Sequence, residues 1–465
     1  MGPNRRLFVF FLGGSLLILF FNLWGRTLEN HDYVRYAEVA REMIRSGDWI
    51  VPRYNGDIFI NKPPLLFWLI ALPSQIHGSV TPFLARFPSA LFAWIGVIVV
   101  YLLGKKIWGE EKYGLISAGT LISSYLFFWQ SRIARTDVVF STLILLSLYF
   151  FYLGYFDRIS SSPSLPDSRL SKTLLSFIFM GLAGLTKGPV GILFPLLIIS
   201  LFLLKEKQLR LLLRKDFLLG YLVIVFILGS WIFPFLTRVG WENALKVWRE
   251  TKILSRHQPF YLYGLKIWIQ FAPWSIFFPF LFMYFWKKER SRDEEFLILW
   301  FIVLFIFLTL FPYRSSKYLL PAYPPLALLM GGFWRKRSLL LFGALFLGAI
   351  VVYHGYEYRA ILRNNDQTPG LLLSQELKPY QDYDISGYQI DVDLLGKINF
   401  YRDTVIPRMN KVKDLKEKVK GKREVFVMTT EKTLQDLTKE GFFVTLLKKI
   451  DFGKENLVLV KIEEL

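Results

Sequence analysis

The chain has 465 residues, of which 53% are hydrophobic, 17% aromatic and only 20% charged, with a net charge of +20 and no cysteine. This composition excludes an ordinary soluble protein and indicates a protein that crosses a membrane several times. The lack of cysteine excludes disulfide bonds and thiolate metal sites.

Long apolar stretches recur through the first three quarters of the sequence. A helix needs about 17 to 25 mostly apolar residues to cross a hydrocarbon layer of roughly 30 Å. Eleven stretches of about this length are predicted to span the membrane: 7–24, 83–104, 113–130, 138–156, 173–186, 189–204, 217–236, 265–286, 296–312, 318–334 and 338–354. No small-residue cleavage pattern follows the first, so we expect a retained helix rather than a signal peptide.

Lysine and arginine gather in alternate connections between these stretches. The basic connections are 105–112, 158–172, 205–215, 287–292 and 335–337, together with the segment before residue 7. This alternation is the positive-inside pattern, which places the N-terminus in the cytoplasm. It also explains much of the net charge without any nucleic acid.

The predicted topology places three longer segments on the outer face, residues 25–82, 237–264 and everything after about 355. We therefore predict a mostly α-helical protein with two domains. A transmembrane domain covers 1–354, with outer loops 25–82 and 237–264, and a small outer α/β domain covers 355–465. A lysine-rich helix is predicted over 409–422, and strands near 424–430, 442–447 and 456–465.

Two of the apolar stretches are short and meet at the sequence "TKGP", which contains Lys187. One kinked helix would place the basic connection 205–215 on the outer face and break the charge alternation. We therefore predict two separate helices. Lys187 would then lie in a recess, which is tolerable where protein or water surrounds the loop.

The first outer loop contains a helical pattern. Its apolar positions are Tyr36, Val39, Ala40, Met43 and Ile44, and its charged positions Glu38, Arg41, Glu42 and Arg45 fall mostly off that face. This pattern predicts an amphipathic helix along the membrane surface. Asp32 is expected to precede the helix, where Arg35 can keep it ionised. A simple membrane anchor is the alternative.

Further charged side chains are predicted on the same outer face. Lys62 precedes two prolines, which favour an extended chain and aim the lysine; it either meets a phosphate or snorkels at the membrane edge. Arg135 and Asp137 open a long apolar span, either as functional groups or as interfacial anchors. With Lys187 and Lys317, these residues bring carboxylates and cations together on one face.

This combination suits the transfer of a sugar from a lipid phosphate to a hydroxyl group. The reaction needs a base for the proton of the acceptor and positive charge for the departing phosphate. A lipid-linked donor is also oriented by the membrane, which holds its head at the depth of these residues.

Several blocks of the sequence resemble one family of membrane enzymes. They include "DYVRYAEVAREMIRSGDWIVPRYNG", "NKPPLLFWL", "ARFPSAL", "ARTDVVFSTLILL", "GLAGLTKGPVGILFP" and "SKYLLPAYPPLALL", in family order over residues 5–335. The family is the protein O-mannosyltransferase superfamily of polyprenyl-phosphate-sugar transferases, and especially its bacterial branch around the lipid A aminoarabinose transferase. The resemblance implies the GT-C fold, inversion at the sugar carbon, and a periplasmic active site in the bacterial inner membrane.

The resemblance also implies roles for individual residues. Asp32 matches the aspartate regarded as the base, and Asp137 the second functional acidic position. Lys62 and Tyr318 match residues at the lipid phosphate. Arg35 matches the arginine of the first loop, and Lys187 matches the "TKGP" lysine, whose role stays open. Arg135 is added to the phosphate-binding cations because of its predicted place on the outer face, not because of the resemblance.

The sequence departs from the family pattern at two positions. Tyr33 replaces an acidic residue, and Asn61 replaces a glutamate. In the aminoarabinose branch that glutamate and a histidine matching His257 are associated with a bound metal. His257 is thus the candidate ligand, but Asn61 is a poor substitute for a carboxylate, which argues against a divalent metal.

The predicted function is transfer of a sugar from a polyprenyl-phosphate carrier to an outer-face acceptor, lipid A or its core, by a single chain embedded in membrane lipids. A protein O-glycosyltransferase of the same fold is one alternative. A flippase or transporter of lipid-linked saccharides is another, although nearly all charges fall at span ends. A scaffold with a partner-binding tail would leave the outer carboxylates and cations unexplained.

Overall fold

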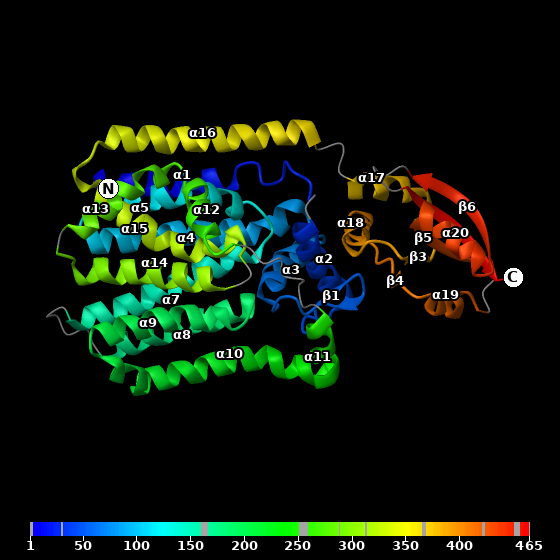
Figure 1. Cartoon of the computed structure of the whole chain (residues 1–465), viewed down its shortest axis with the longest axis horizontal. Coiled ribbons are helices and arrows are strands. Elements are labelled where there is room, and N and C mark those ends of the chain that lie inside the picture. The colour runs from blue at the N-terminus through cyan, green and yellow to red at the C-terminus, as the bar shows by residue number, and fades with distance from the viewer. Residues whose placement is uncertain are drawn as a thin grey trace. The chain divides into compact units, whose positions relative to one another are not determined.

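The computed structural model describes residues 3–28, 31–159, 166–250, 259–287, 289–311, 314–364, 369–420, 424–450 and 456–464. These residues are mostly helical, as predicted (Figure 1). The chain forms two compact units. Unit 1 contains Met1–Leu23, Ile60–Leu69 and Arg86–Arg359, and unit 2 contains Trp24–Phe59, Ile70–Ala85 and Ala360–Leu465. The predicted domains, 1–354 and 355–465, stay a prediction.

Unit 1 is a bundle of apolar helices. The helices that lie wholly or mostly in it are α1 (Pro3–Phe20), α4 (Pro82–Trp108), α5 (Glu111–Ile122), α6 (Tyr125–Ser131), α7 (Thr136–Ile159), α8 (Pro166–Lys187), α9 (Val190–Lys205), α10 (Lys215–Val239), α11 (Trp241–Glu250), α12 (Leu262–Gln270), α13 (Phe278–Trp286), α14 (Arg292–Leu310), α15 (Tyr323–Phe333) and α16 (Leu339–Asn364). Short 3₁₀ helices connect some of them: η1 (Leu209–Leu213), η2 (Trp274–Phe277), η3 (Ser316–Ala322) and η4 (Trp334–Lys336). Helix α8 packs against α7, α9 and α10, and α15 packs against α5 and α14 (Figure 1).

Within the described residues, four helices are long and apolar enough to cross a membrane, in α4, α7, α10 and α16. The pair Leu262–Gln270 and Trp274–Trp286, bent by 114°, could be a fifth span. Shorter apolar helices lie at Phe8–Phe20, Leu65–His77 and Val190–Lys205. The membrane-protein class therefore agrees with the sequence, whereas the count of eleven spans stays a prediction.

Some predicted spans are not single helices. The stretch 113–130 is divided between α5 and α6, where the hydroxyls of Ser123 and Ser124 donate to the carbonyls of Gly119 and Leu121 at 2.6 and 2.8 Å. The stretch 265–286 is divided by Pro273, and 318–334 begins as the 3₁₀ helix η3. Serine bonds to the backbone and proline both interrupt helices, which explains why apolar runs of spanning length are broken here.

Unit 2 combines the first loop with the C-terminal segment. The loop contributes α2 (His31–Ser46), the hairpin of β1 (Arg53–Tyr54) and β2 (Asp57–Ile58), and most of α3 (Leu65–His77). Asn55 and Gly56 form the hairpin turn with φ of 56° and 82°, as expected for an Asn-Gly pair. Helix α2 packs on α18 (Val392–Arg402) of the C-terminal segment.

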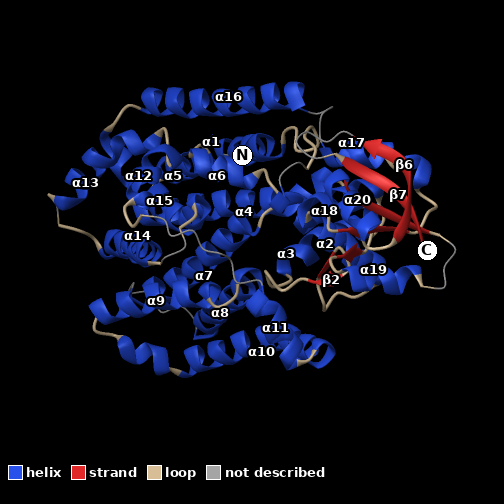
Figure 2. Cartoon of the chain, turned by 45° about the vertical axis from the view of Figure 1, so that its right-hand side comes forward, coloured by secondary structure: helices blue, strands red, loops and turns tan. Residues whose placement is uncertain are grey.

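The C-terminal segment is an α/β layer, as the sequence predicts (Figure 2). Its other helices are α17 (Pro369–Glu376), η6 (Lys378–Tyr380), α19 (Val412–Val419) and α20 (Glu431–Lys439). The strands β3 (Ile385–Tyr388), β4 (Arg408–Met409), β5 (Val425–Thr430), β6 (Phe442–Ile450) and β7 (Leu457–Glu464) form one sheet in the order β4-β3-β5-β7-β6. Strand β3 runs parallel to β4 and β5, and β7 runs antiparallel to β5 and β6.

Alternate residues of the central strands enter two separate cores. Leu457 and Leu459 of β7 join one core, and Val458 and Val460 join the other. This period of two is the geometry of a strand that is covered on both faces. The predicted strands at 424–430, 442–447 and 456–465 are thus confirmed, and the predicted helix at 409–422 is confirmed as the shorter α19.

Candidate functional site

A cavity of about 280 Å³ lies in unit 1 among side chains that the sequence singled out. Lys62, Lys187 and Tyr318 line it together with an apolar wall made of Phe140, Val190, Phe194, Phe307, Leu308 and Phe311. Lys62 comes from the turn before α3, Lys187 from the end of α8, and Tyr318 from η3. The cavity therefore presents two cations and a phenol beside an aromatic and aliphatic surface.

Lys187 is held by a carboxylate and by two aromatic rings. Its Nζ donates to Asp137 Oδ1 at 2.5 Å, and it lies 4.8 Å from the ring centre of Phe140 and 5.0 Å from that of Tyr318. The Nζ of Lys317 lies 5.9 Å from the same tyrosine ring. Ammonium groups over aromatic faces are stabilised by the ring quadrupole, so the aromatic side chains help to keep charge in an apolar wall.

The chain reversal after Lys187 explains its position. Helix α8 ends at Lys187, Gly188 adopts a φ of 77°, and α9 starts after Pro189. Glycine at the end of one helix and proline at the start of the next are typical stop and start signals. The prediction of two separate helices at "TKGP" is confirmed, and the lysine at the reversal is one of the residues that line the cavity.

Helices α8 and α9 approach closely at Gly191. A Cβ atom added there would lie 2.3 Å from the backbone carbon of Ala183. We expect Gly191→Ala to lower the free energy of unfolding by about 1–3 kcal/mol, because backbone cannot yield as a side chain can. The measurement is the melting temperature of the purified protein in detergent. Gly229→Ala in α10 is the control, since a Cβ there has open space, and it should be neutral or slightly stabilising.

Asp137 lies in the first turn of α7 and is the centre of a buried ion cluster. Its Oδ2 accepts from Arg135 Nε at 2.9 Å, while its Oδ1 accepts from Lys187. Its side chain is only 2% exposed. A buried carboxylate is tolerable when opposite charges and hydrogen bonds compensate it, and here two cations do so. The geometry brings Asp137, Arg135 and Lys187 together, as the sequence predicts.

Arg132, directly after α6, is buried and binds groups from other helices. It pairs with Glu357 at 2.8 Å and donates to the carbonyl groups of Ile18, Leu19 and Phe21, which joins α16 and the end of α1 to this turn. Its side chain is 1% exposed. Arg132 therefore fixes the turn that carries Arg135 and Asp137.

Asp32 and Arg35 lie in unit 2, on the first two turns of α2. The prediction that Asp32 precedes the helix is wrong, since α2 begins at His31 and Asp32 is in its first turn, where a carboxylate is favoured by the helix dipole. Arg35 Nη1 lies 3.7 Å from Asp32 Oδ1, and Arg35 Nη2 donates to Asp393 Oδ1 in a closer contact. Burial alone lowers the pKa of Arg35, but the hydrogen bond and charge of Asp393 outweigh it and raise the pKa above its ordinary value.

Three of the charged residues that the sequence places mostly off the apolar face of α2 are nevertheless buried, whereas Arg45 is exposed; the place of this helix along the membrane surface stays a prediction. Glu38, Arg41 and Glu42 are buried beside the predicted apolar face. Arg41 binds Glu38 through two nitrogens at 2.7 and 2.8 Å and also reaches Asp403 at 2.9 Å. Burial raises the pKa of Glu38 to about 7 against the opposing effect of Arg41. Because α18 packs on α2, these three side chains are paired with protein groups instead of water.

Residues 61–233 match a family described as dolichyl-phosphate-mannose-protein mannosyltransferase. Two proteins of Aquifex aeolicus are 32% and 30% identical to this chain over 329 and 339 residues, which are 70% and 71% of this chain and 63% and 72% of theirs. An undecaprenyl phosphate-alpha-4-amino-4-deoxy-L-arabinose arabinosyl transferase of Pseudomonas fluorescens is 26% identical over 307 residues, which are 64% of this chain and 52% of that protein. The chain belongs to the protein mannosyltransferase family of membrane glycosyltransferases. It spans only about half the length of the arabinosyl transferases that it matches.

The fold agrees with this family assignment. ArnT from Cupriavidus metallidurans, crystallised with undecaprenyl phosphate, superposes with a TM-score of 0.81 over 98% of both chains at 19% identity. The GT-C type of fold expected for this family is therefore confirmed.

Two positions bear on a possible metal site, Asn61 and His257. His257 lies outside them, and within them no group of three His, Asp or Glu side chains is placed to hold a metal ion. Asn61, which replaces the family glutamate, offers a neutral amide next to Lys62. A metal site on Asn61 and His257 stays a prediction that the chemistry of Asn61 argues against.

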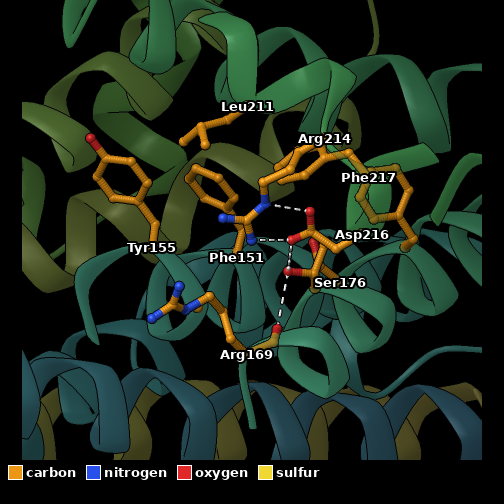
Figure 3. A pocket seen from close by; sticks show the side chains of 11 residues that line it. Phe151, Tyr155, Arg169, Ser176, Leu211, Arg214, Asp216 and Phe217 are labelled. Carbon is orange, nitrogen blue, oxygen red and sulfur yellow. Dashed lines mark hydrogen bonds and ion pairs between the residues drawn. The ribbon is translucent and has the colours of Figure 1, made fainter. Parts of the chain in front are cut away.

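A second polar pocket of unit 1 lies among α7, α8, η1 and α10 (Figure 3). Arg214 and Asp216 form a double hydrogen bond in it, and Thr173 donates to the same carboxylate at 3.3 Å. Its volume is about 20 Å³, enough for roughly one water molecule. This pocket cannot hold a sugar or a lipid head, so the cavity beside Lys62, Lys187 and Tyr318 is the better site for a family ligand.

Proposed function

We propose that the protein transfers a sugar from a polyprenyl-phosphate carrier to a hydroxyl or phosphate group of an acceptor on the periplasmic side of the bacterial inner membrane, with lipid A or its core as the acceptor. The observation that carries the proposal is the cavity of unit 1, in which Lys62, Lys187 and Tyr318 adjoin an apolar wall. An isoprenoid phosphate has the same division into a charged head and an apolar chain.

The charges of this region suit a departing phosphate. Lys187, Arg135 and Asp137 sum to +1, and Lys62 brings the total to +2. A polyprenyl-phosphate sugar carries one negative charge, and the polyprenyl phosphate that leaves carries up to two. Positive charge that is fixed in an apolar, water-poor wall stabilises this increase in the transition state without reorganisation.

The remaining requirement is a base for the acceptor, and we assign it to Asp32. The Asp32 carboxylate accepts the proton of the acceptor hydroxyl as the acceptor oxygen bonds to the anomeric carbon. The bond from that carbon to the phosphate oxygen breaks, its electron pair stays on the phosphate, and the sugar configuration inverts. Asp137 contributes by holding Lys187 and Arg135 in place, and Arg35 by the positive charge that it places near Asp32.

The donor site is tested by Lys62→Gln. Binding of undecaprenyl phosphate to the protein in nanodiscs should weaken by about 10- to 100-fold, since a hydrogen bond to a charged group contributes about 1.5–3 kcal/mol. Lys215→Gln, at the exposed start of α10, makes the same chemical change outside the cavity and should bind like the wild type. Equal affinity of Lys62→Gln and wild type would remove the cavity as the donor site.

The acceptor is tested by mass spectrometry of lipid A from cells with and without the gene. A sugar mass that is lost with the gene would support lipid A as the acceptor. Unchanged lipid A together with an altered glycoprotein would move the acceptor to protein. Movement of a lipid-linked sugar across reconstituted vesicles without any transfer would contradict the enzymatic proposal.

A further inference from the structure

Arg35 is shared between two carboxylates of unit 2 that are far apart in sequence. Its Nη2 binds Asp393 of α18, whereas its Nη1 is 3.7 Å from Asp32, which is longer than a hydrogen bond. Its guanidinium carbon also lies 5.7 Å from the ring centre of Tyr54. The arginine therefore directs its hydrogen bond to Asp393 and offers Asp32 only its charge.

The backbone around Asp393 is held in place by hydrogen bonds. Asp391 caps α18, and its Oδ1 accepts from the amides of Asp393 and Leu394 at 3.0 and 2.9 Å. The carbonyl of Val392, one residue earlier, accepts from Tyr54 Oη at 3.2 Å and from Asn55 Nδ2 at 2.9 Å. The start of α18 is thus held both by its cap and by the hairpin of the first loop.

The hairpin is in turn held by α2. Glu42 accepts from the amides of Asn55 and Gly56 at 2.6 and 3.0 Å. Gly396 allows α18 to approach, since a Cβ atom there would lie 1.9 Å from the Tyr54 hydroxyl. Helix α2, the hairpin and α18 therefore form one closed set of contacts, and Arg35 and Asp393 lie within it.

This arrangement has a consequence for Asp32. Asp32 and Arg35 are three residues apart on α2, a spacing at which opposite charges pair directly. A carboxylate that is bound by a guanidinium through hydrogen bonds has its lone pairs occupied and is a weaker base. Because Asp393 draws the guanidinium toward α18, Arg35 places its charge near Asp32 while its hydrogen bond is directed elsewhere.

We propose that Asp393 is a positioning residue, which holds Arg35 off Asp32 so that Asp32 can accept the proton of the acceptor. The inference rests on the proposed function, because it takes Asp32 as the base. It also assigns a role to the C-terminal segment, which fixes the geometry of the catalytic loop from 358 residues away in the sequence. In the described part of the chain, Tyr54 also faces Arg35 from β1, and Glu38, Arg41 and Asp403 form a separate ion cluster on the same helix pair.

The first experiment compares Asp393→Asn with Asp403→Asn in steady-state kinetics. The assay uses protein in liposomes with undecaprenyl phosphate-linked 4-amino-4-deoxy-L-arabinose and lipid A, over pH 5 to about 9. For Asp393→Asn we expect kcat to fall about tenfold with little change in KM, and the acidic midpoint of the kcat profile to move down by about one pH unit, because Arg35 then closes on Asp32. Asp393→Glu should restore most of the activity.

Asp403→Asn is the matched control. It removes the same charge and breaks another pair between α2 and the end of α18, that of Arg41, but it does not touch Arg35. Asp403 has a φ of 55°, which asparagine also adopts readily, so the backbone is not disturbed. This variant should keep the wild-type profile, and identical profiles for Asp393→Asn and wild type would overturn the proposal.

The second experiment does not depend on the substrates. A water-soluble carbodiimide reacts with carboxyl groups in their protonated form, and peptide mass spectrometry reports the rate at Asp32. Labelling of Asp32 at about pH 5 should be several-fold slower in Asp393→Asn than in wild type or Asp403→Asn. Slower labelling together with full activity of Asp32→Asn would contradict only the proposed base, whereas unchanged labelling would overturn the positioning role itself.

Discussion

Asp32→Asn is expected to lower sugar transfer by about 10²- to 10⁴-fold, the usual contribution of a general base. The amide keeps the size of the side chain and its place in the first turn of α2, but it cannot accept the proton of the acceptor. The measurement is the rate of product formation in liposomes together with the affinity for undecaprenyl phosphate. The affinity should stay unchanged, because the cavity that is proposed for the phosphate is lined by other residues.

Asp57→Asn provides the matched control for this prediction. Asp57 is an exposed carboxylate of β2 in the same loop, and its replacement removes an equal charge. It should transfer sugar at close to the wild-type rate. Near-equal rates for Asp32→Asn and Asp57→Asn would show that the base lies elsewhere.

The helix that carries Asp32 shows what the spacing of apolar residues can predict and what it cannot. The i, i+3, i+4 and i+7 spacing of Tyr36, Val39, Ala40 and Met43 predicts the helix and its buried face, and all four are buried. The same periodicity cannot reveal that Glu38 and Arg41 are buried as well. Their burial depends on α18, which lies more than 350 residues further along the chain and supplies Asp403. A local sequence pattern cannot predict a partner that is so distant in the sequence.

The sequence likewise predicts some of the residues that line the cavity and not others. Lys62, Lys187 and Tyr318 follow from charge at the ends of apolar stretches, from "TKGP", and from family resemblance, and the structure places all three around one space. The phenylalanines of its wall give no such signal, because an apolar residue in a membrane helix looks the same whether it faces lipid, a neighbour or a cavity. The sequence does not predict a role for Asp393 either, since nothing around it distinguishes it from the other acidic residues of the tail.

The breaks in the apolar stretches have a local origin that the sequence does display. Ser123, Ser124 and Pro273 stand inside stretches that hydropathy treats as continuous. Averaging over about 20 residues hides one proline or two serines, although each removes or diverts backbone hydrogen bonds. Turn signals therefore locate the interruptions better than mean hydropathy does.

Asp137→Asn should have the largest effect on stability. The substitution leaves Lys187 and Arg135 buried without their carboxylate, and breaking a buried pair in this way costs about 3–5 kcal/mol. We expect a clearly lower melting temperature in detergent, and loss of transfer because Lys187 no longer has a fixed position at the cavity. Asp216→Asn is the control, since its partner Arg214 is 36% exposed and water can replace the pair at a cost of about 1 kcal/mol.

The double variant Asp137→Asn/Lys187→Met separates stability from chemistry. Removing the uncompensated lysine should recover part of the lost stability, with a coupling free energy of about 0.5–3 kcal/mol between the two sites. Transfer should stay low, because the cavity has then lost one of its two cations. A double variant that melts no higher than Asp137→Asn would contradict the ion pair as the source of stability, and one that regains full transfer would remove Lys187 from the phosphate site.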